Sequence, residues 1–213
     1  MLDIQGFGYN RDDLPQPPEA RISDLNAWFN LPRGPLELEI GSGKGTFLAQ
    51  HAPLHPETAF LGIEWTREYF RLAADRARRL GLANARLLWH DAMVFLRQSV
   101  PEAAFQVIHL YFPDPWPKPR HHKRRTFGLP FLQQAHRVLV PGGTVRVVTD
   151  HAEYFDWMQE HAAAAVELGL FEREAFEPLD SAGEGEWVGT NFERKYRTQG
   201  RTFNGMVLRV RDR

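Results

Sequence analysis

The chain has 213 residues and a formal net charge of −1, with 43% hydrophobic and 25% charged residues. This profile is typical of a globular domain with a substantial core, and the net charge excludes a uniformly basic nucleic-acid coat. There is no cysteine, which excludes disulfide bonds and cysteine-ligated metal sites. No apolar run approaches the roughly 18 residues of a membrane span, and no signal-peptide pattern opens the chain, so we expect a cytoplasmic protein.

Short apolar runs alternate with helical stretches along most of the chain. Residues 1–18 are rich in Gly, Asp, Asn and Pro and indicate an irregular arm, and apolar spacing indicates a short helix over 19–29. From residue 36 the alternation predicts a mainly parallel sheet with helices on both faces. The predicted strands are 36–40, 58–63, 85–89, 105–111, 143–148, 171–176 and 203–210. The predicted helices are 44–52, 66–80, 92–98, 127–139 and 151–167, and a long polar loop is expected over 178–202.

A glycine-rich turn follows the first predicted strand. Residues 38–46 place Glu39 just before Gly41, Gly43 and Gly45. Glycines permit a tight turn and a close approach of the backbone to a ligand, although a plain strand-to-helix turn would look similar. The spacing differs from that of nicotinamide-binding folds and phosphate-binding loops. The Glu39 carboxylate would repel a pyrophosphate and suit an ammonium group.

Two further acids end the next two predicted strands. Glu64 is placed to accept hydrogen bonds from both hydroxyls of a ribose. Asp91 is placed to receive an adenine amino group, although it is equally suited to cap the following helix. Ligands of open α/β sheets bind at the carboxyl ends of the strands. Together with Glu39, these acids therefore predict a pocket for S-adenosylmethionine, an adenosine with an amino-acid tail and no phosphate.

A stretch of prolines and basic residues follows the fourth predicted strand. Prolines occupy four alternate positions in residues 113–119, and five of the eight residues in 118–125 are Lys or Arg. Because proline biases the preceding residue towards extended conformations, we expect Asp114, Trp116 and Lys118 on a stiff, extended backbone. The basic run suits the phosphates of a polyanion such as RNA, although a rigid loop with a solvated basic patch would read the same way.

Asp114 is expected beside the methyl donor. A carboxylate can accept the N1–H and amino donors of guanine, while N7 on the other edge of the base faces the sulfonium. N7 already carries a lone pair, so catalysis would consist chiefly of positioning. Trp116 can stack on a base or hold the loop in place. His121 and His122 lack neighbouring carboxylates or cysteines, so we expect no metal site.

Most of the chain, from residue 36 to residue 210, resembles the bacterial tRNA (guanine-N7)-methyltransferases. The motifs that carry the resemblance are residues 39–45, 62–64, 112–118, 121–125, 149–150 and 190–193. The Pro-Asp-Pro-Trp-Pro-Lys block with its basic tail is highly specific, whereas the glycine-rich turn is generic to methyltransferases. We therefore expect an N-terminal arm with a short helix (1–35) and one methyltransferase domain (36–213). The fold would be a Rossmann-like class I methyltransferase fold, with a seven-stranded, mostly parallel sheet of order 3-2-1-4-5-7-6 and an antiparallel last strand.

The resemblance also implies a reaction and the residues that carry it out. A monomer or homodimer, acting away from membranes, would transfer the methyl group of S-adenosylmethionine to N7 of the guanine at position 46, in the variable region of a tRNA. Asp114 would be the catalytic residue. The residues expected at S-adenosylmethionine are Glu39, Gly41, Gly43, Gly45, Glu64, Asp91 and Asp114. Those expected at the target nucleotide are Lys118, Asp150, Thr190, Asn191, Phe192 and Glu193, and those expected at the RNA are Arg120, His121, His122, Lys123, Arg124 and Arg125.

Other interpretations fit parts of the sequence. Asp114-Pro115-Trp116 is similar to the Asp-Pro-Pro-aromatic loop of enzymes that methylate exocyclic amines, so another RNA base or amine is an alternative substrate. A non-catalytic RNA-binding protein with the same fold is a second alternative, but it would have no use for a donor pocket. At single positions, Asp150 can simply cap the following helix, and Thr190 with Glu193 can form a capping box.

Overall fold

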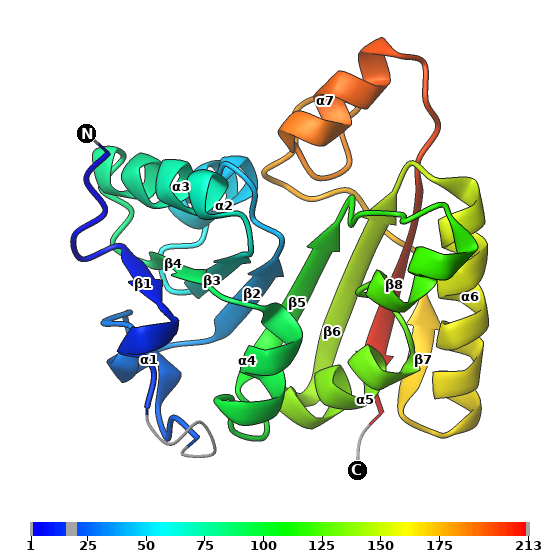
Figure 1. The fold of residues 1–213 in the computed structure, drawn as a ribbon, viewed down its shortest axis with the longest axis horizontal. Coiled ribbons are helices and arrows are strands. Elements are labelled where there is room, and N and C mark those ends of the chain that lie inside the picture. Colours follow the sequence, from blue (N-terminus) through cyan, green and yellow to red (C-terminus); the bar gives the residue numbers. More distant parts are fainter. Residues whose placement is uncertain (1, 16–20, 212–213) are drawn as a thin grey trace.

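Eight strands form one sheet in the computed structural model, which describes residues 2–15 and 21–211 (Figure 1). The strands are β1 (Gly8–Asn10), β2 (Leu36–Ile40), β3 (Ala59–Glu64), β4 (Ala85–Trp89), β5 (Phe105–Tyr111), β6 (Leu139–Thr149), β7 (Phe171–Glu174) and β8 (Asn204–Val210). Their order across the sheet is β1-β4-β3-β2-β5-β6-β8-β7. Only β8 is antiparallel to its neighbours, β6 and β7. The predicted α/β class, and the predicted order of the seven strands from β2 to β8, are confirmed.

The expected number of seven strands is wrong, because β1 adds an eighth at the edge. β1 lies in the segment expected to be irregular and pairs in parallel with β4. Gly8 also lets β1 pack closely against α3, because a Cβ there would lie only 2.9 Å from the ring of Phe70. A strand of three residues is too short to show a period of two, so its sequence gives no pattern from which it could be predicted.

Helices flank the sheet. They are α1 (Leu25–Trp28), α2 (Thr46–His51), α3 (Arg67–Arg79), α4 (Ala92–Gln98), α5 (Leu129–Val138), α6 (Ala152–Glu167) and α7 (Asn191–Thr198), with short 3-10 helices η1 (Arg11–Asp13), η2 (Ala52–Leu54) and η3 (Pro119–Arg124). The helix expected over 19–29 is reduced to α1, which Asp24 caps; residues 19 and 20 lie outside the described residues. The loop expected over 178–202 contains α7. Within the described part of the chain, no helix is long and apolar enough to cross a membrane.

Apolar side chains of the strands alternate between two cores. Leu61 and Leu88 face the core that includes α1, α4, α5 and α6, whereas their neighbours Phe60 and Leu87 face the core that includes α2 and α3. Strands buried on both faces need continuous apolar runs, and these runs made the strands predictable from the sequence. Figure 1 shows α7 beyond the end of the sheet to which the arrows of β2, β5 and β6 point. The loops at this end carry the residues described next.

Candidate active site

A cavity lies at the carboxyl end of β2. Its walls come from the glycine-rich turn, from α2 and α3, from the end of β5 and from the start of α7. The lining residues are Glu39, Gly41, Ser42, Gly43, Lys44, Thr46, Phe47, Tyr69, Tyr111, Thr190, Asn191, Phe192 and Lys195. The cavity thus brings together residues expected at the methyl donor and residues expected at the target nucleotide.

Glu39 is the buried acid of this cavity. It is 5% exposed, and its Oε2 has no hydrogen-bond partner in the described structure. Burial, helped by the negative charge of Glu64, raises the pKa of Glu39 to about 8. A buried polar atom without a partner costs free energy, and a cationic hydrogen-bond donor removes that cost. Glu39 therefore fits the ammonium group of an amino-acid tail.

Glu64 supports the glycine-rich turn beside Glu39. The backbone N–H of Gly43 donates to one Glu64 oxygen at 2.8 Å, and the N–H of Thr66 donates to the other at 2.7 Å. Gly41 and Gly43 have φ values of 78° and 52°, and a Cβ at either would meet no atom within 4 Å. The turn thus leaves open space beside its backbone. Each Glu64 oxygen also keeps a second lone pair for a ligand hydroxyl.

Four of the residues expected at the donor lie outside the cavity lining, namely Gly45, Glu64, Asp91 and Asp114. Gly45 has a φ of 68°, and a Cβ there would lie 2.9 Å from the Cβ of Ala73. Gly45 therefore permits the close packing of α2 against α3, and its contact with the donor stays a prediction. Asp91 caps α4, since its side chain accepts a hydrogen bond from the N–H of Val94 at 2.9 Å. The structure thus shows the capping role of Asp91, and its contact with an adenine stays a prediction.

Asp114 is exposed after β5 and does not line the cavity. Burial raises the pKa of Tyr196, and the charges of Asp150 and Asp114 raise it further, so both carboxylates lie near this phenol. Tyr196 belongs to α7 and packs against Phe112, with ring centroids 6.0 Å apart. The first residues of α7 therefore line the cavity, and Tyr196, later in the same helix, lies near Asp114. Asp150 forms an ion pair with Arg201.

Glu193 ties the segment before α7 to the helix. It is fully buried and accepts hydrogen bonds from the N–H groups of residues 187–189 at 2.6, 2.9 and 2.9 Å. It also pairs with Arg197, and Thr190 accepts a hydrogen bond from its N–H at 3.1 Å. The carboxylate of Glu193 is thus engaged within the protein, and its contact with the target nucleotide stays a prediction. Of the 190–193 segment, Asn191 and the exposed Phe192 are the residues that face the cavity without such bonds.

The proline-rich loop is less extended than expected. Lys118 has extended backbone angles (φ −79°, ψ 128°), but Trp116 has a φ of 42° and Phe112 one of 50°. The Arg124 guanidinium lies over the ring of Trp116, 4.9 Å from its centroid. The ring of His121 packs edge-on against Trp116, with centroids 5.9 Å apart. Trp116 thus holds the loop against the basic run. Its stacking on a base is not needed to explain its position.

The basic run folds into η3, which separates its side chains. Arg120, Lys123 and Arg124 are exposed. His122 instead packs edge-on against Trp157, with ring centroids 5.6 Å apart. The expected cationic surface is therefore present but smaller than the six residues from Arg120 to Arg125.

Arg125 is the clearest correction within this run. Its side chain is 0% exposed and forms an ion pair with Glu153 on α6 at 2.8 Å. Its Nε donates to the Pro115 carbonyl at 2.8 Å, next to Asp114, and its guanidinium lies 5.1 Å from the centre of the Trp157 ring. The hydrogen bond from Arg125 lowers the pKa of Glu153. Arg125 fastens the loop to α6 and has no surface left for a phosphate.

This position predicts a stability effect. Arg125→Met should lower the free energy of unfolding by about 2–4 kcal/mol, because it removes charge-assisted hydrogen bonds from a buried site. Denaturant unfolding of the variant beside Lys123→Met, which changes an exposed cation of the same run, measures this difference. Equal stability of the two variants would contradict the role of Arg125 as a fastening residue.

Several lining residues had no signal strong enough to be named from the sequence. Phe47 and Tyr69 belong to amphipathic helices, where an aromatic side chain usually indicates core packing. Lys195 lies on α7, in a segment whose polarity resembles a loop. Tyr111 ends β5 and opens the proline-rich stretch, so its position at a strand end was the one available hint.

The sequence of the chain matches known methyltransferases. The profile of a family described as putative methyltransferases matches residues 33–205. A tRNA (guanine-N(7)-)-methyltransferase of Alkalilimnicola ehrlichii is 34% identical over 93% of this chain and 82% of its own length. One of Halorhodospira halophila is 34% identical over 91% and 82%, and one of Sodalis glossinidius 37% identical over 78% and 66%.

Solved structures agree on the fold. A SAM-dependent methyltransferase from Aquifex aeolicus has a TM-score of 0.56 and 16% identity over 84% of both chains. The antibiotic-resistance methyltransferase Kmr has a TM-score of 0.59 and 18% identity over 90% of this chain and 95% of its own. At these low sequence identities, the structural similarity shows only a shared fold. The sequence matches described above also show the family. The resemblance inferred from the motifs is thus confirmed, and the chain belongs to the tRNA (guanine-N(7)-)-methyltransferase family.

Proposed function

We propose that this protein transfers a methyl group from S-adenosylmethionine to N7 of a guanine in tRNA. The observation that carries the proposal is the position of α7 between two chemically different places. Its first residues line the cavity with the unpaired Glu39 carboxylate, and Tyr196 lies near Asp114. A site for a cationic donor therefore adjoins a site for a base with hydrogen-bond donors. The curated relatives bear the name of this reaction.

On the donor side, S-adenosylmethionine supplies a methyl group on a positively charged sulfur when it is bound. Glu39 accepts hydrogen bonds from the ammonium of its tail, and Gly41 and Gly43 leave room for the tail beside the backbone. Glu64 accepts hydrogen bonds from the ribose hydroxyls, and Asp91 accepts one from the adenine amino group. These roles use two buried acids whose burial would otherwise destabilise the site.

On the acceptor side, Asp114 accepts hydrogen bonds from N1–H and the amino group of the guanine. N7 reacts through its own lone pair and becomes positively charged, so no proton has to leave and no strong base is needed. Lys118, Asp150, Asn191 and Phe192 border the nucleotide. The guanine at position 46 of the variable region is the proposed target. Positioning of this kind can supply roughly 7–11 kcal/mol of a reaction barrier.

The exposed cations of η3 are the proposed phosphate contacts. Replacing Arg120 and Lys123 with glutamine should weaken tRNA binding and lower the slope of log affinity against log salt, by about 0.7–0.9 for each lost contact. Binding titrations at several salt concentrations measure the slope. Arg97→Gln, at the far end of α4, is the matched control and should leave the slope unchanged. An equal slope for the double variant and the wild type would show that η3 does not touch RNA.

Incubation with a labelled methyl donor and unmodified tRNA, followed by nucleoside analysis, tests the reaction itself. We expect label in 7-methylguanosine at position 46. Label in an N6-methylated adenosine or in another base would replace the proposed acceptor. Absence of both label transfer and donor binding by calorimetry would favour a non-catalytic RNA-binding protein.

Two further properties follow from the proposed substrate. Because tRNA is the acceptor, the cytoplasm is the proposed location. A monomer or a homodimer is the proposed assembly, since the donor cavity and Asp114 both belong to one chain.

A further inference from the structure

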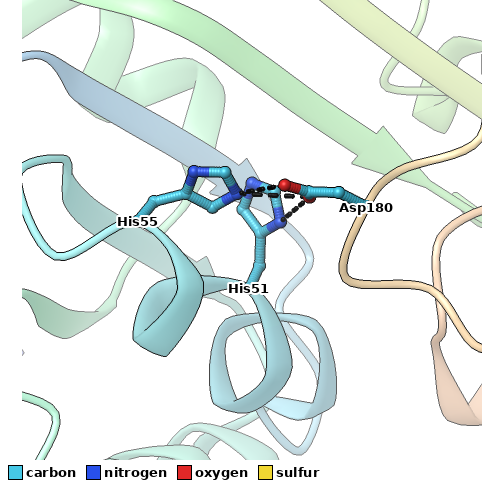
Figure 2. Close-up of side chains that lie close together, drawn as sticks. All are labelled: His51, His55 and Asp180. Carbon is cyan, nitrogen blue, oxygen red and sulfur yellow. Dashed lines mark hydrogen bonds and ion pairs between the residues drawn. The ribbon is translucent and has the colours of Figure 1, made fainter.

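Two histidines and an aspartate meet on the side of α2 and η2 that faces the strap, the name we give to residues 175–190 between β7 and α7. Figure 2 shows His51 and His55 pointing at the carboxylate of Asp180, which the strap supplies. Among residues 2–15 and 21–211, these three form the one group of His, Cys, Asp or Glu whose ligand atoms all lie within 4.8 Å of one another. None of these three residues lines the donor cavity. The cluster is therefore a site distinct from that cavity.

The distances within the cluster suit a small tetrahedral cation. His55 Nε2 lies 3.1 Å from one Asp180 oxygen, and His51 Nδ1 lies 3.6 Å from the other. Ligands about 2.0–2.2 Å from a tetrahedral zinc ion lie about 3.3 Å from one another. The side chains of Asp180 and His55 are 61% and 33% exposed, so an ion can enter from solvent and keep one position for water.

The ring of His51 lies between two carboxylates. Its Nδ1 faces Asp180, while its Nε2 faces the Glu37 carboxylate at 3.9 Å. Metal-ligating histidines usually donate their second N–H to a carboxylate, which orients the ring. Glu37 is the carboxylate on that side of His51, at a distance longer than a hydrogen bond. Glu37 is itself fixed by His109, 2.7 Å away. The hydroxyl of Ser181 lies 2.8 Å from His51 Nδ1 and would give up this hydrogen bond when an ion binds.

We propose that His51, His55 and Asp180 bind one divalent transition-metal ion, with zinc as the best match. The two-nitrogen, one-oxygen ligand set and its open position agree with the ligand preferences of zinc. The ion would join the strap to α2, which follows the glycine-rich turn. It would thereby hold the segment that continues into Thr190 and the cavity wall. The site is independent of the histidine pair at 121–122.

Zinc titration of the full chain, after treatment with a chelator, tests this site. We expect one ion per chain by calorimetry and by elemental analysis, and cobalt(II) should give the absorption of a tetrahedral complex. His55→Ala and Asp180→Ala should each weaken zinc binding at least about 100-fold, and Glu37→Gln about 10- to 100-fold. Hydrogen exchange in the strap should slow when zinc is added to the wild type only.

The controls separate this site from other histidines and from misfolding. His121→Ala should bind zinc like the wild type, and the melting temperatures of all variants with chelator present report whether they are folded. His55 and Asp180 are partly exposed, which makes both variants tolerable. Absence of binding at micromolar zinc by the wild type would overturn the proposal, as would undiminished binding by folded His55→Ala and Asp180→Ala.

Discussion

Asp114→Ala is expected to lower the rate constant of methyl transfer by about 10²- to 10³-fold, the usual loss when one preorganised hydrogen-bonding group is removed from a reacting centre. Asp114 is exposed and holds no other residue of the described structure in place by a side-chain hydrogen bond. Its removal should therefore change the free energy of unfolding by less than about 0.5 kcal/mol. Affinity for tRNA should stay within about threefold, because the phosphate contacts lie elsewhere. Single-turnover kinetics and tRNA titrations measure the two effects separately.

Two further variants sharpen this result. Asp114→Asn keeps the shape of the side chain but replaces one acceptor oxygen with a donor, so it should be almost as slow as Asp114→Ala. Asp156→Ala removes an exposed acid from α6 and should retain full activity. A rate constant for Asp114→Ala within about fivefold of the wild-type value would show that Asp114 does not contribute to catalysis.

Glu39→Gln should weaken the binding of S-adenosylmethionine by about 30- to 1,000-fold, because truncating one side of a buried charge pair costs roughly 2–4 kcal/mol. Isothermal calorimetry measures the loss. The same substitution should stabilise the protein without its donor at about pH 8. There the wild type holds a carboxyl group that is buried without a partner at Oε2. Glu39 would thus increase the affinity for the donor and decrease the stability of the donor-free protein, a trade-off typical of ligand-binding residues.

The sign of this effect follows from the pKa of Glu39, which rises from 4.5 to about 8 on folding. Between these values the folded protein keeps a proton that the unfolded chain has lost, so stability without the donor falls as the pH rises. Glu39→Gln lacks this loss and should exceed the wild type by about 1–3 kcal/mol at pH 8. Donor affinity of the wild type should rise from about pH 6 to about pH 7.5, with release of a proton. The stability difference between Glu39→Gln and the wild type should be larger at pH 8 than at pH 5. An equal difference at the two pH values would show that folding does not raise the pKa of Glu39.

The parts of the fold that were predictable are those with a strong local pattern. The five strands from β2 to β6 are buried on both faces or nearly so, and their apolar runs identify them. β1 and α7 were not recognised, for different reasons. β1 has only three residues, and it pairs with β4, which is remote in sequence. α7 has few apolar residues, and its stability comes from Glu193 and Thr190 at its first turn.

The candidate site was predictable at strand ends and less so within motifs. Glu39 and Glu64 lie together because parallel neighbours end at one edge of the sheet. Motif membership did not reveal which charged residues are buried, so Arg125 and Glu193 were grouped with exposed neighbours. The zinc ligands proposed above were invisible for another reason, because Asp180 lies 125 residues from His55.

The two borders of the sheet also decide how copies of this chain can associate. At one border stands β1, with three residues, and at the other β7, with four, where Glu172 and Glu174 form ion pairs with Arg211 and Arg209. Very short edge strands, and edge strands with charged side chains such as those of β7, are poor templates for another strand. Continuation of the sheet from one copy into the next is therefore disfavoured, and a dimer would have to be built from helical or loop surfaces.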